Sequence, residues 1–318
     1  MKIGVALCTY NGERFVATQL QSIFGQTRAP DLVTACDDAS TDGTFPLLQG
    51  LASGAPCRVD LVRNPANLGY LRNFEQAIGR CDADIVVLSD QDDEWRADRL
   101  ERIERAFAAD PAVGAVFSDA EIVDERLASL GYGLLQALHA DRAEREALST
   151  GRLFPVLLKR NLVTGATLAF RRSWVPTVLP IPPAAVHDEW IALVIAASGS
   201  LRFLPDRLIR YRQHGGNQIG ARRLTVGDRA RLLATPRRAQ NERVLAVMKA
   251  LAGRLAGQAD PATRTEVAQK IEHLERRIRL PAARLPRVPG VIAEIANARY
   301  FRYSSGWRAI VRDLLSPM

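Results

Sequence analysis

Aspartates gather in two short segments early in the chain, and each segment follows an apolar run. Asp37 and Asp38 come after the first run, and Asp90, Asp92 and Asp93 come after the second. Carboxylates held this close raise one another's pKa unless a cation joins them. Mg²⁺ or Mn²⁺ typically takes one or two carboxylates plus phosphate oxygens and water. The second segment therefore predicts a metal site, with a solvated acidic turn before a helix as the simpler alternative.

Two later segments also carry side chains suited to chemistry. Asp188 opens an apolar helical segment. There its carboxylate could do no more than interact favourably with the helix dipole, or it could act as a general base toward a hydroxyl. Arg212 and His214 precede a pair of glycines. A lone histidine is more often structural than a ligand, but an arginine nearby in a glycine-rich loop favours contact with a phosphate or a metal.

The residues before 121 alternate short apolar runs with segments of helical spacing, which predicts βαβ units and a mostly parallel sheet. Ligands of such sheets bind beyond the carboxyl ends of the strands. The polar clusters TYNG, DDASTDG and SDQDD each follow a strand, so we expect them to meet at one edge. Strands are expected at 3–8, 31–36, 58–62, 85–88 and 113–117, and helices at 14–24, 44–51, 70–78 and 100–107.

The second half of the chain is organised differently. We expect a strand pair or a bent strand at 161–170, a helix at 187–197, and two short strands at 201–204 and 207–211. From 224 to 280 the pattern is helical, and prolines then break it. Residues 221–318 carry 20 basic and 8 acidic side chains, a net charge of +12, whereas the rest of the chain sums to −4. This asymmetry indicates two functional parts and an anionic partner for the second.

Composition and missing motifs exclude several classes of protein. With 47% hydrophobic and 25% charged residues the chain is globular rather than disordered. It has no GxGxxG after the first strand, no GxxxxGK[ST], no GxSxG and no HExxH, which argues against dinucleotide, P-loop, α/β-hydrolase and zincin enzymes. Its apolar runs are too short for a membrane span or a signal peptide. We therefore expect the protein to begin at Met1 and to be cytoplasmic.

Several segments together resemble family 2 glycosyltransferases, which are inverting enzymes with the GT-A fold. CTYNGERFVATQLQSIFGQT, ACDDASTDGT and VVLSDQDDEWRADRL resemble the nucleotide-sugar half of that family, which would occupy residues 1–120. NLVTGATLAF, HDEW and YRQHGGNQIG are similar to the acceptor half, at 121–220, and the last of these resembles rhamnosyltransferases. The resemblance implies an α/β fold with a Rossmann-like, mixed but mostly parallel sheet over 1–220. The basic, mainly helical region 221–318 lies outside it.

The resemblance assigns roles to residues of the donor half by their place in the motifs. Thr9, Tyr10 and Glu13 would line the nucleotide pocket, and Asp38 would bind the pyrimidine base. Asp90 would lie near the ribose or a metal-bound water. These residues would hold a nucleotide-diphospho-sugar, either dTDP-rhamnose or a UDP-sugar, because the two bases present the same imide edge.

The remaining roles concern the metal and the reaction. By resemblance, Asp92 would bind Mn²⁺ or Mg²⁺ directly, and His214 would complete the metal or pyrophosphate site with Arg212 nearby. A divalent ion would neutralise the charge on the diphosphate leaving group. Asp188 would be the base that deprotonates the acceptor hydroxyl, and a single displacement would then invert the anomeric carbon. No covalent intermediate is needed, which agrees with the lack of a Ser or Cys nucleophile motif.

The leading hypothesis is a metal-dependent hexosyltransferase acting in cell-envelope polysaccharide biosynthesis on a glycan or lipid-linked acceptor. A nucleotidyltransferase and a catalytically inactive nucleotide- or glycan-binding protein on the same fold are the alternatives. Residues 221–318 could contact the inner face of the cell membrane peripherally, pack on the catalytic domain or bind a second subunit. Four aromatic residues among arginines suit a membrane surface: Tyr300, Phe301, Tyr303 and Trp307. No nucleic-acid motif is visible, so no nucleic acid is expected as a partner.

Overall fold

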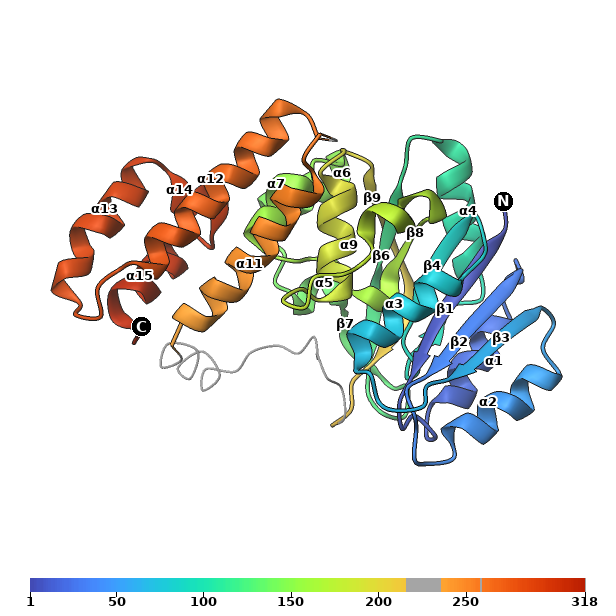
Figure 1. Cartoon of the computed structure of the whole chain (residues 1–318). Coiled ribbons are helices and arrows are strands. Elements are labelled where there is room, and N and C mark those ends of the chain that lie inside the picture. The colour runs from blue at the N-terminus through green and yellow to red at the C-terminus, as the bar shows by residue number, and fades with distance from the viewer. Residues whose placement is uncertain (216–235, 258, 318) are drawn as a thin grey trace. The chain divides into compact units, whose positions relative to one another are not determined.

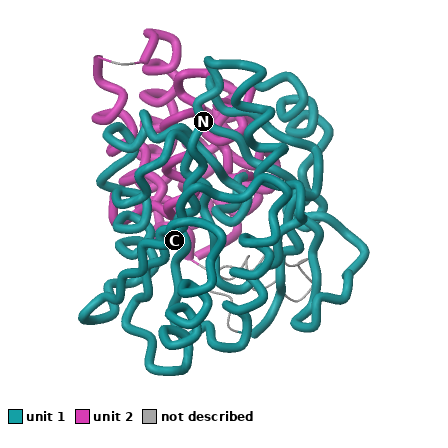
Figure 2. Tube along the Cα trace, turned by 90° about the vertical axis from the view of Figure 1, so that its right-hand side faces the viewer, with its two compact units in different colours: residues 1–151, 163–181, 200–222 teal, residues 152–162, 182–199, 223–318 magenta. Residues whose placement is uncertain are grey.

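The computed structural model describes residues 1–215, 236–257 and 259–317. The predicted helical stretch from 224 to 235 lies outside these residues. The chain divides into two compact units (Figure 2). Unit 1 comprises residues 1–151, 163–181 and 200–222, and unit 2 comprises residues 152–162, 182–199 and 223–318. Two short segments before residue 220 therefore group with the C-terminal helices, and one of them carries Asp188.

Unit 1 is built on a nine-stranded mixed sheet with the strand order β3-β2-β1-β4-β8-β6-β9-β5, and β7 pairs with β6 (Figure 1). The four strands β3, β2, β1 and β4 are mutually parallel, as the alternation of strands and helices predicts. The sheet confirms the α/β fold expected from the sequence. Its strands are β1 Ile3–Thr9, β2 Leu32–Asp37, β3 Arg58–Arg63, β4 Ile85–Ser89, β5 Glu94–Trp95, β6 Ala115–Val123, β7 Ser129–Gly133, β8 Leu168–Arg171 and β9 Leu201–Arg212.

Helices cover both faces of the parallel part of the sheet. Successive strand side chains point to opposite faces. Ile3, Val5 and Leu7 of β1 join a core that also contains buried residues of α1, α2 and α4. On the other face, α3 packs against β1 and β2 through Phe74 and Ile78. The helices of unit 1 are α1 Val16–Phe24, α2 Thr44–Ser53, α3 Tyr70–Arg80, α4 Arg99–Ala109, α5 Leu134–Ala137, α6 Arg142–Thr150, η1 Gly165–Thr167, η2 Arg172–Trp174 and α8 Val175–Val178.

Two predictions for the second half of the sheet were wrong in detail. The segment 161–170 is not a strand pair: a 3₁₀ turn, η1, precedes the single antiparallel strand β8, which lies between β4 and β6. The two short strands expected around 201–211 are one strand, β9, which pairs in parallel with β6. The register shifts between Leu204 and Arg207, so Pro205 lies in a bulge, where its missing N–H breaks no ladder.

Unit 2 is helical, as predicted for the C-terminal region. Its core includes Trp190 from α9 and Val247 and Leu251 from α11. Helices α11 and α12 pack on each other, and α7 packs on α9 and α14. No helix of the described residues is long and apolar enough to cross a membrane. The helices are α7 Phe154–Lys159, α9 His187–Ala196, α11 Arg238–Arg254, α12 Pro261–Ile278, η3 Leu285–Arg287, α13 Val288–Ala296, α14 Arg299–Tyr303 and α15 Trp307–Leu315.

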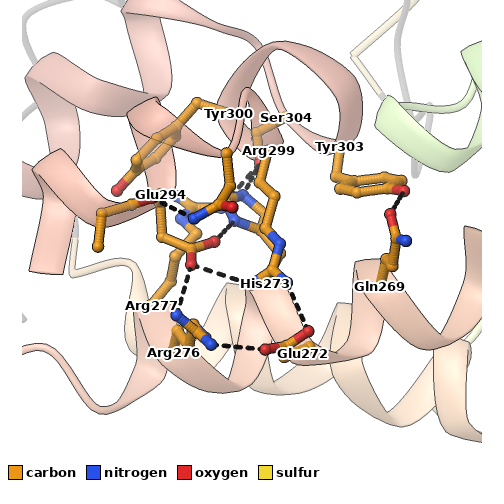
Figure 3. Close-up of polar contacts among 12 residues, drawn as sticks. Gln269, Glu272, His273, Arg276, Arg277, Glu294, Arg299, Tyr300, Tyr303 and Ser304 are labelled. Carbon is orange, nitrogen blue, oxygen red and sulfur yellow. Dashed lines mark hydrogen bonds and ion pairs between the residues drawn. The ribbon is translucent and has the colours of Figure 1, made fainter.

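The last helices of unit 2 enclose a buried polar network (Figure 3). The Arg277 guanidinium makes two hydrogen bonds to Asp313, of 2.5 and 2.8 Å, and the Tyr300 hydroxyl donates to the same carboxylate at 2.8 Å. His273 Nδ1 lies 2.6 Å from Glu294 Oε2. Tyr300 and Tyr303 are fully buried, so the expectation that they form a membrane-facing surface was wrong. Both rings can lie in the core because each hydroxyl forms a hydrogen bond there.

Candidate functional site

Three loops meet at the carboxyl edge of the parallel strands, as the sequence predicts. Gln91, in the loop after β4, accepts from Tyr10 N at 2.7 Å and donates to Tyr10 O at 3.0 Å. Asn11 N donates to Ser40 Oγ at 2.9 Å, and Thr41 N donates to Asn11 Oδ1 at 2.8 Å. The turn after β1 is thus hydrogen-bonded to the loops after both β2 and β4.

The three residues predicted to line a nucleotide pocket differ in their surroundings. The Thr9 hydroxyl is buried and donates to Asp37 Oδ1 at 3.0 Å. Glu13 Oε2 accepts from Gly43 N at 2.9 Å, and so braces the turns after β1 and β2. A Cβ added at Gly43 would lie 2.7 Å from the Glu13 carboxylate, so a larger residue there would displace this side chain. Tyr10 is 42% exposed and Glu13 is exposed as well, so both are accessible to a ligand, whereas Thr9 is buried.

Asp38 is buried and organises the loop that leads into α3. Its Oδ1 accepts from Asn64 Nδ2 and from Leu68 N, each at 2.8 Å, and its Oδ2 accepts from Gly69 N at 2.9 Å. A carboxylate oxygen has two lone pairs, so Oδ2 keeps capacity for one more donor. Contact with the N–H of a nucleobase imide would use that capacity.

The loop after β4 approaches the end of β9, and this contact brings together the predicted metal ligands. Asp92 Oδ2 lies 2.8 Å from His214 Nε2, and both side chains are largely buried. The His214 ring packs on Phe15, with ring centroids 4.6 Å apart. Asp92 and His214 are 122 positions apart in the sequence, yet the sheet places them within hydrogen-bond distance.

Arg212 joins the same two segments through its backbone and its side chain. Its N–H donates to Asp93 Oδ1 at 3.0 Å, and its Nε donates to Asp92 O at 2.6 Å. Its guanidinium also lies over the Phe15 ring, 4.7 Å from the centroid. Because Arg212 is 4% exposed and makes these bonds, it fixes the acidic loop, a role that the sequence did not suggest.

Burial sets the electrostatics behind this loop. Desolvation, followed by the charges of Asp92 and Asp90, raises the pKa of Asp93 well above its usual range. The buried Arg99 guanidinium is its compensating cation, and desolvation lowers the pKa of Arg99 to about 9 against the opposing effect of Asp93 and Asp90. Among the described residues, Asp93 Oδ2 is buried without a hydrogen-bond partner. A cation bound at this loop would relieve the repulsion among these carboxylates.

The residues present fit a divalent ion that shares its coordination with a ligand. Within the described residues there is no group of three or more His, Cys, Asp or Glu side chains arranged to hold a metal. Asp92 and His214 supply two donors, a carboxylate oxygen and an imidazole nitrogen, and Mn²⁺ accepts both. Their separation of 2.8 Å is a hydrogen-bond distance, so a bound ion would replace the hydrogen bond between these two atoms. Phosphate oxygens and water would complete such a site.

Asp188, the predicted base, lies in the first turn of α9 in unit 2 and is 9% exposed. Its Oδ1 accepts from Glu189 N at 2.5 Å, and Asn161 Nδ2 lies 3.4 Å away. Burial lowers the pKa of the adjacent His187 to about 3, so that imidazole is neutral near pH 7. The start of α9 is also held by Arg243, a residue the sequence did not single out.

Arg243 belongs to α11, and its Nη1 donates to Ala184 O at 3.0 Å and to Glu189 Oε2 at 3.1 Å. Gln91 and Phe15 were likewise not predicted as site residues. Both lie inside the matched motifs, next to the residues that were chosen, and this position is the one signal that could have identified them. For Arg243 no signal exists, because it lies in a helix outside every motif.

The chain is similar to known glycosyltransferases in sequence and in fold. Residues 4–150 match the family model described as Glycosyl transferase family 2. The uncharacterized glycosyltransferase alr2836 of Nostoc sp. is 29% identical over 224 residues, covering 68% of this chain and 66% of that protein. The dTDP-rhamnosyl transferase RfbG of Shigella flexneri is 25% identical over 229 residues, covering 68% of this chain and 74% of that protein. The match to the Nostoc protein thus spans just under two thirds of that protein's length.

The fold has clear relatives among solved structures. The mannosyltransferase PcManGT of Pyrobaculum calidifontis, solved in complex with GDP-Man and Mn²⁺, superposes with a TM-score of 0.56 at 19% identity. The superposition covers 98% of this chain and 85% of that chain. At this identity the likeness establishes the GT-A fold, whereas the family assignment comes from the sequence matches. Residues 4–150 thus carry a glycosyl transferase family 2 domain.

Proposed function

We propose that this protein is a metal-dependent, inverting glycosyltransferase that moves a sugar from a nucleotide diphosphate to an acceptor hydroxyl. The observation that carries the proposal is the Asp92–His214 pair, 2.8 Å apart at the carboxyl edge of the parallel strands. A carboxylate and an imidazole at that edge suit a divalent ion bound to the donor diphosphate. Tyr10, the loop fixed by Asp38, and Asp90 would contact the nucleoside.

The chemistry is a single displacement at the sugar C1 atom. Asp188 takes the proton of the acceptor hydroxyl, and the acceptor oxygen forms a bond to C1 as the bond from C1 to the diphosphate oxygen breaks. A divalent ion, when bound, stabilises the negative charge that develops on the diphosphate. Asp92 and His214 would hold that ion. Arg212 keeps the acidic loop in place. It would therefore act by positioning that loop rather than by touching the substrate, although the sequence favoured a phosphate contact.

The relatives suggest which donors to try first. RfbG is named a dTDP-rhamnosyl transferase, so dTDP-rhamnose is the leading donor, with UDP-sugars next. We propose a hydroxyl of a growing cell-surface glycan, free or lipid-linked, as the acceptor. A catalytically inactive nucleotide-binding protein on the same fold is the second candidate, and the experiment below separates the two.

Thermal unfolding against dTDP, UDP, GDP and their sugars, with and without Mn²⁺, tests donor and metal binding. A ligand at about 100 Kd stabilises the folded state by roughly 2.7 kcal/mol. We expect a Mn²⁺-dependent shift with dTDP ligands that is lost in Asp92→Asn. Sugar transfer to water or to glycan acceptors is then measured for the wild type and for Asp188→Asn. The variant should bind donor like the wild type but transfer no sugar.

Each part of the proposal has a result that would overturn it. The absence of a shift with every nucleotide would remove donor binding altogether. A shift that persists in Asp92→Asn would remove this residue as the metal ligand. Full transfer by Asp188→Asn would remove the base assignment, and donor binding without any transfer by the wild type would support the inactive alternative.

A further inference from the structure

Exposed large apolar side chains concentrate at the C-terminal end of the described residues. Of the twelve such side chains that the structure describes, seven fall between residues 285 and 315. Isolated exposed apolar residues are common on proteins, but a cluster of them marks an interaction surface. We call six of them the C-terminal apolar surface: Leu285, Val288, Ile292, Trp307, Val311 and Leu315.

The spacing of these residues places them on single faces of two helices. Trp307, Val311 and Leu315 follow one another at four-residue intervals along α15, so they form one stripe. The opposite face of α15 is buried in the core through Ala309 and Ile310. Val288 and Ile292 form a similar stripe on α13, which packs against α15. Each helix is therefore apolar on its solvent side as well as on its core side, and folding of the unit does not account for the solvent side.

Within the segment 281–317, the exposed charged side chains are of one sign. Glu294 and Asp313 are the two carboxylates between residues 281 and 317, and both are buried. Arg284 and Arg308 are exposed on the same helical segment. The solvent-facing part of the segment thus presents apolar side chains and guanidinium groups with no carboxylate between them.

Buried hydrogen bonds join α15 to α12 and to the turn η3 that precedes α13. Asp313 of α15 is bound by Arg277 of α12 through two hydrogen bonds. Arg287 Nη1 donates to Asp313 O at 2.9 Å and to Ser316 O at 2.7 Å. A hollow of about 300 Å³ beside these helices is lined in part by Arg276 and Arg279. Asp313 and Glu294 thus lie in the interior, whereas Glu272 and Glu266 of α12 pair with Arg299 and Arg302.

We propose that the C-terminal apolar surface docks on an anionic phospholipid bilayer. Apolar side chains enter the boundary between headgroups and acyl chains, and arginines beside them bind the lipid phosphates. A protein partner would need carboxylates facing the same arginines, whereas an anionic bilayer supplies negative charge over any area. This function is independent of sugar transfer and would bring the enzyme to acceptors held at a membrane.

Sedimentation with vesicles tests the proposal on the full-length protein. We expect pelleting with vesicles that contain phosphatidylglycerol, little pelleting with pure phosphatidylcholine, and release at high salt. The double variant Trp307→Gln, Val311→Gln should lose binding at least tenfold. Arg284→Gln and Arg308→Gln should each weaken it about fivefold. Leu130→Gln in β7 is the matched control, because Leu130 and Val311 are both 43% exposed, and it should bind like the wild type.

Other occupants of the surface would give different results. Circular dichroism melting checks that each variant is folded, and these substitutions should leave the melting temperature unchanged because the side chains are exposed. If no variant pellets with anionic vesicles and neither does the wild type, the proposal fails. If the wild type forms a dimer that the Trp307→Gln, Val311→Gln variant dissociates, without any vesicle binding, a second copy covers the surface. Vesicle binding that these substitutions leave intact would also overturn the proposal.

Discussion

Gln91, Asp92 and Asp93 are consecutive, yet each makes a different contact. Gln91 bonds to the backbone of Tyr10, Asp92 pairs with His214, and Asp93 accepts from the backbone of Arg212. One loop can thus organise the turn after β1, offer a metal ligand and anchor the end of β9. Sequence reasoning identified the acidic character of this loop, but it could not divide these tasks among the three side chains.

Lys270 shows how burial changes a single charge. It lies in α12 with 3% of its side chain exposed, and its Nζ donates to Tyr303 O. Desolvation, followed by repulsion from Arg277, lowers the pKa of Lys270 to about 7, while attraction to Glu189 opposes the shift. Between about pH 7 and 10 the unfolded chain binds a proton here that the folded chain does not, so this residue makes the free energy of unfolding rise with pH across that window.

Replacing Lys270 by Met should therefore stabilise the protein most at low pH. Below about pH 7 the folded state carries the full cost of a buried ammonium, and its removal should raise the free energy of unfolding by roughly 1–4 kcal/mol. The gain should shrink toward pH 10, where the wild-type amine is already neutral. Urea unfolding at several pH values measures both quantities. Lys249→Met, at a 56% exposed side chain, is the control; a gain independent of pH would rule out the buried charge as its source.

At the scale of elements, the start of α9 depends on a neighbouring helix. Helix α9 begins with His187 and Asp188, and Val186, the N-cap residue before it, makes no side-chain hydrogen bond to the helix. Arg243 of α11 supplies the missing restraint by binding both Ala184 O and Glu189. The position of the proposed base is thus set partly by a residue in the region that no motif covers. Arg243 is a positioning residue rather than a catalytic one.

We expect Arg243→Ala to lower kcat about tenfold or more while leaving the KM for the donor nearly unchanged. Loss of the guanidinium frees the first turn of α9 without touching the donor-binding loops of unit 1. Arg243→Lys should restore part of the rate, since it keeps the charge but not the planar guanidinium that places Nη1 between both acceptors. Steady-state kinetics on folded variants measures the split. A rise in donor KM as large as the fall in kcat would point to a general loss of structure instead. A Lys variant as slow as the Ala variant would point to the same conclusion.

At the scale of the whole molecule, the predicted donor contacts and the predicted base fall in different units. The proposed nucleotide and metal residues from Thr9 to His214 belong to unit 1, whereas Asp188 and the C-terminal apolar surface belong to unit 2. Net charge is also unevenly distributed: residues 221–318 sum to +12, whereas the rest of the chain sums to −4. Donor binding and membrane docking are therefore assigned to separate parts of the chain.

Hydrogen exchange should reveal this division directly. With a nucleotide donor and Mn²⁺, we expect slower amide exchange in the turn after β1, the loop after β2 and the loop after β4. Helices α12 to α15 should exchange at the same rate with and without the donor. Mass spectrometry of peptides from both units measures this, with Asp92→Asn as the control that lacks the effect. Donor protection confined to α12–α15 would contradict the assignment of the donor site to unit 1.

The alternation of strands and helices, and the meeting of three polar loops at one sheet edge, could be predicted from the sequence. These features are local: hydrophobic period fixes each element, and parallel pairing sends every strand's carboxyl end to the same side. What those loops contact became clear from the three-dimensional arrangement alone. Asp92 and His214, Asp38 and Asn64, and Tyr300 and His273 are pairs in contact whose members lie far apart in the chain. Such contacts depend on how β8 and β9 enter the sheet and how the last helices pack, and no periodicity encodes that.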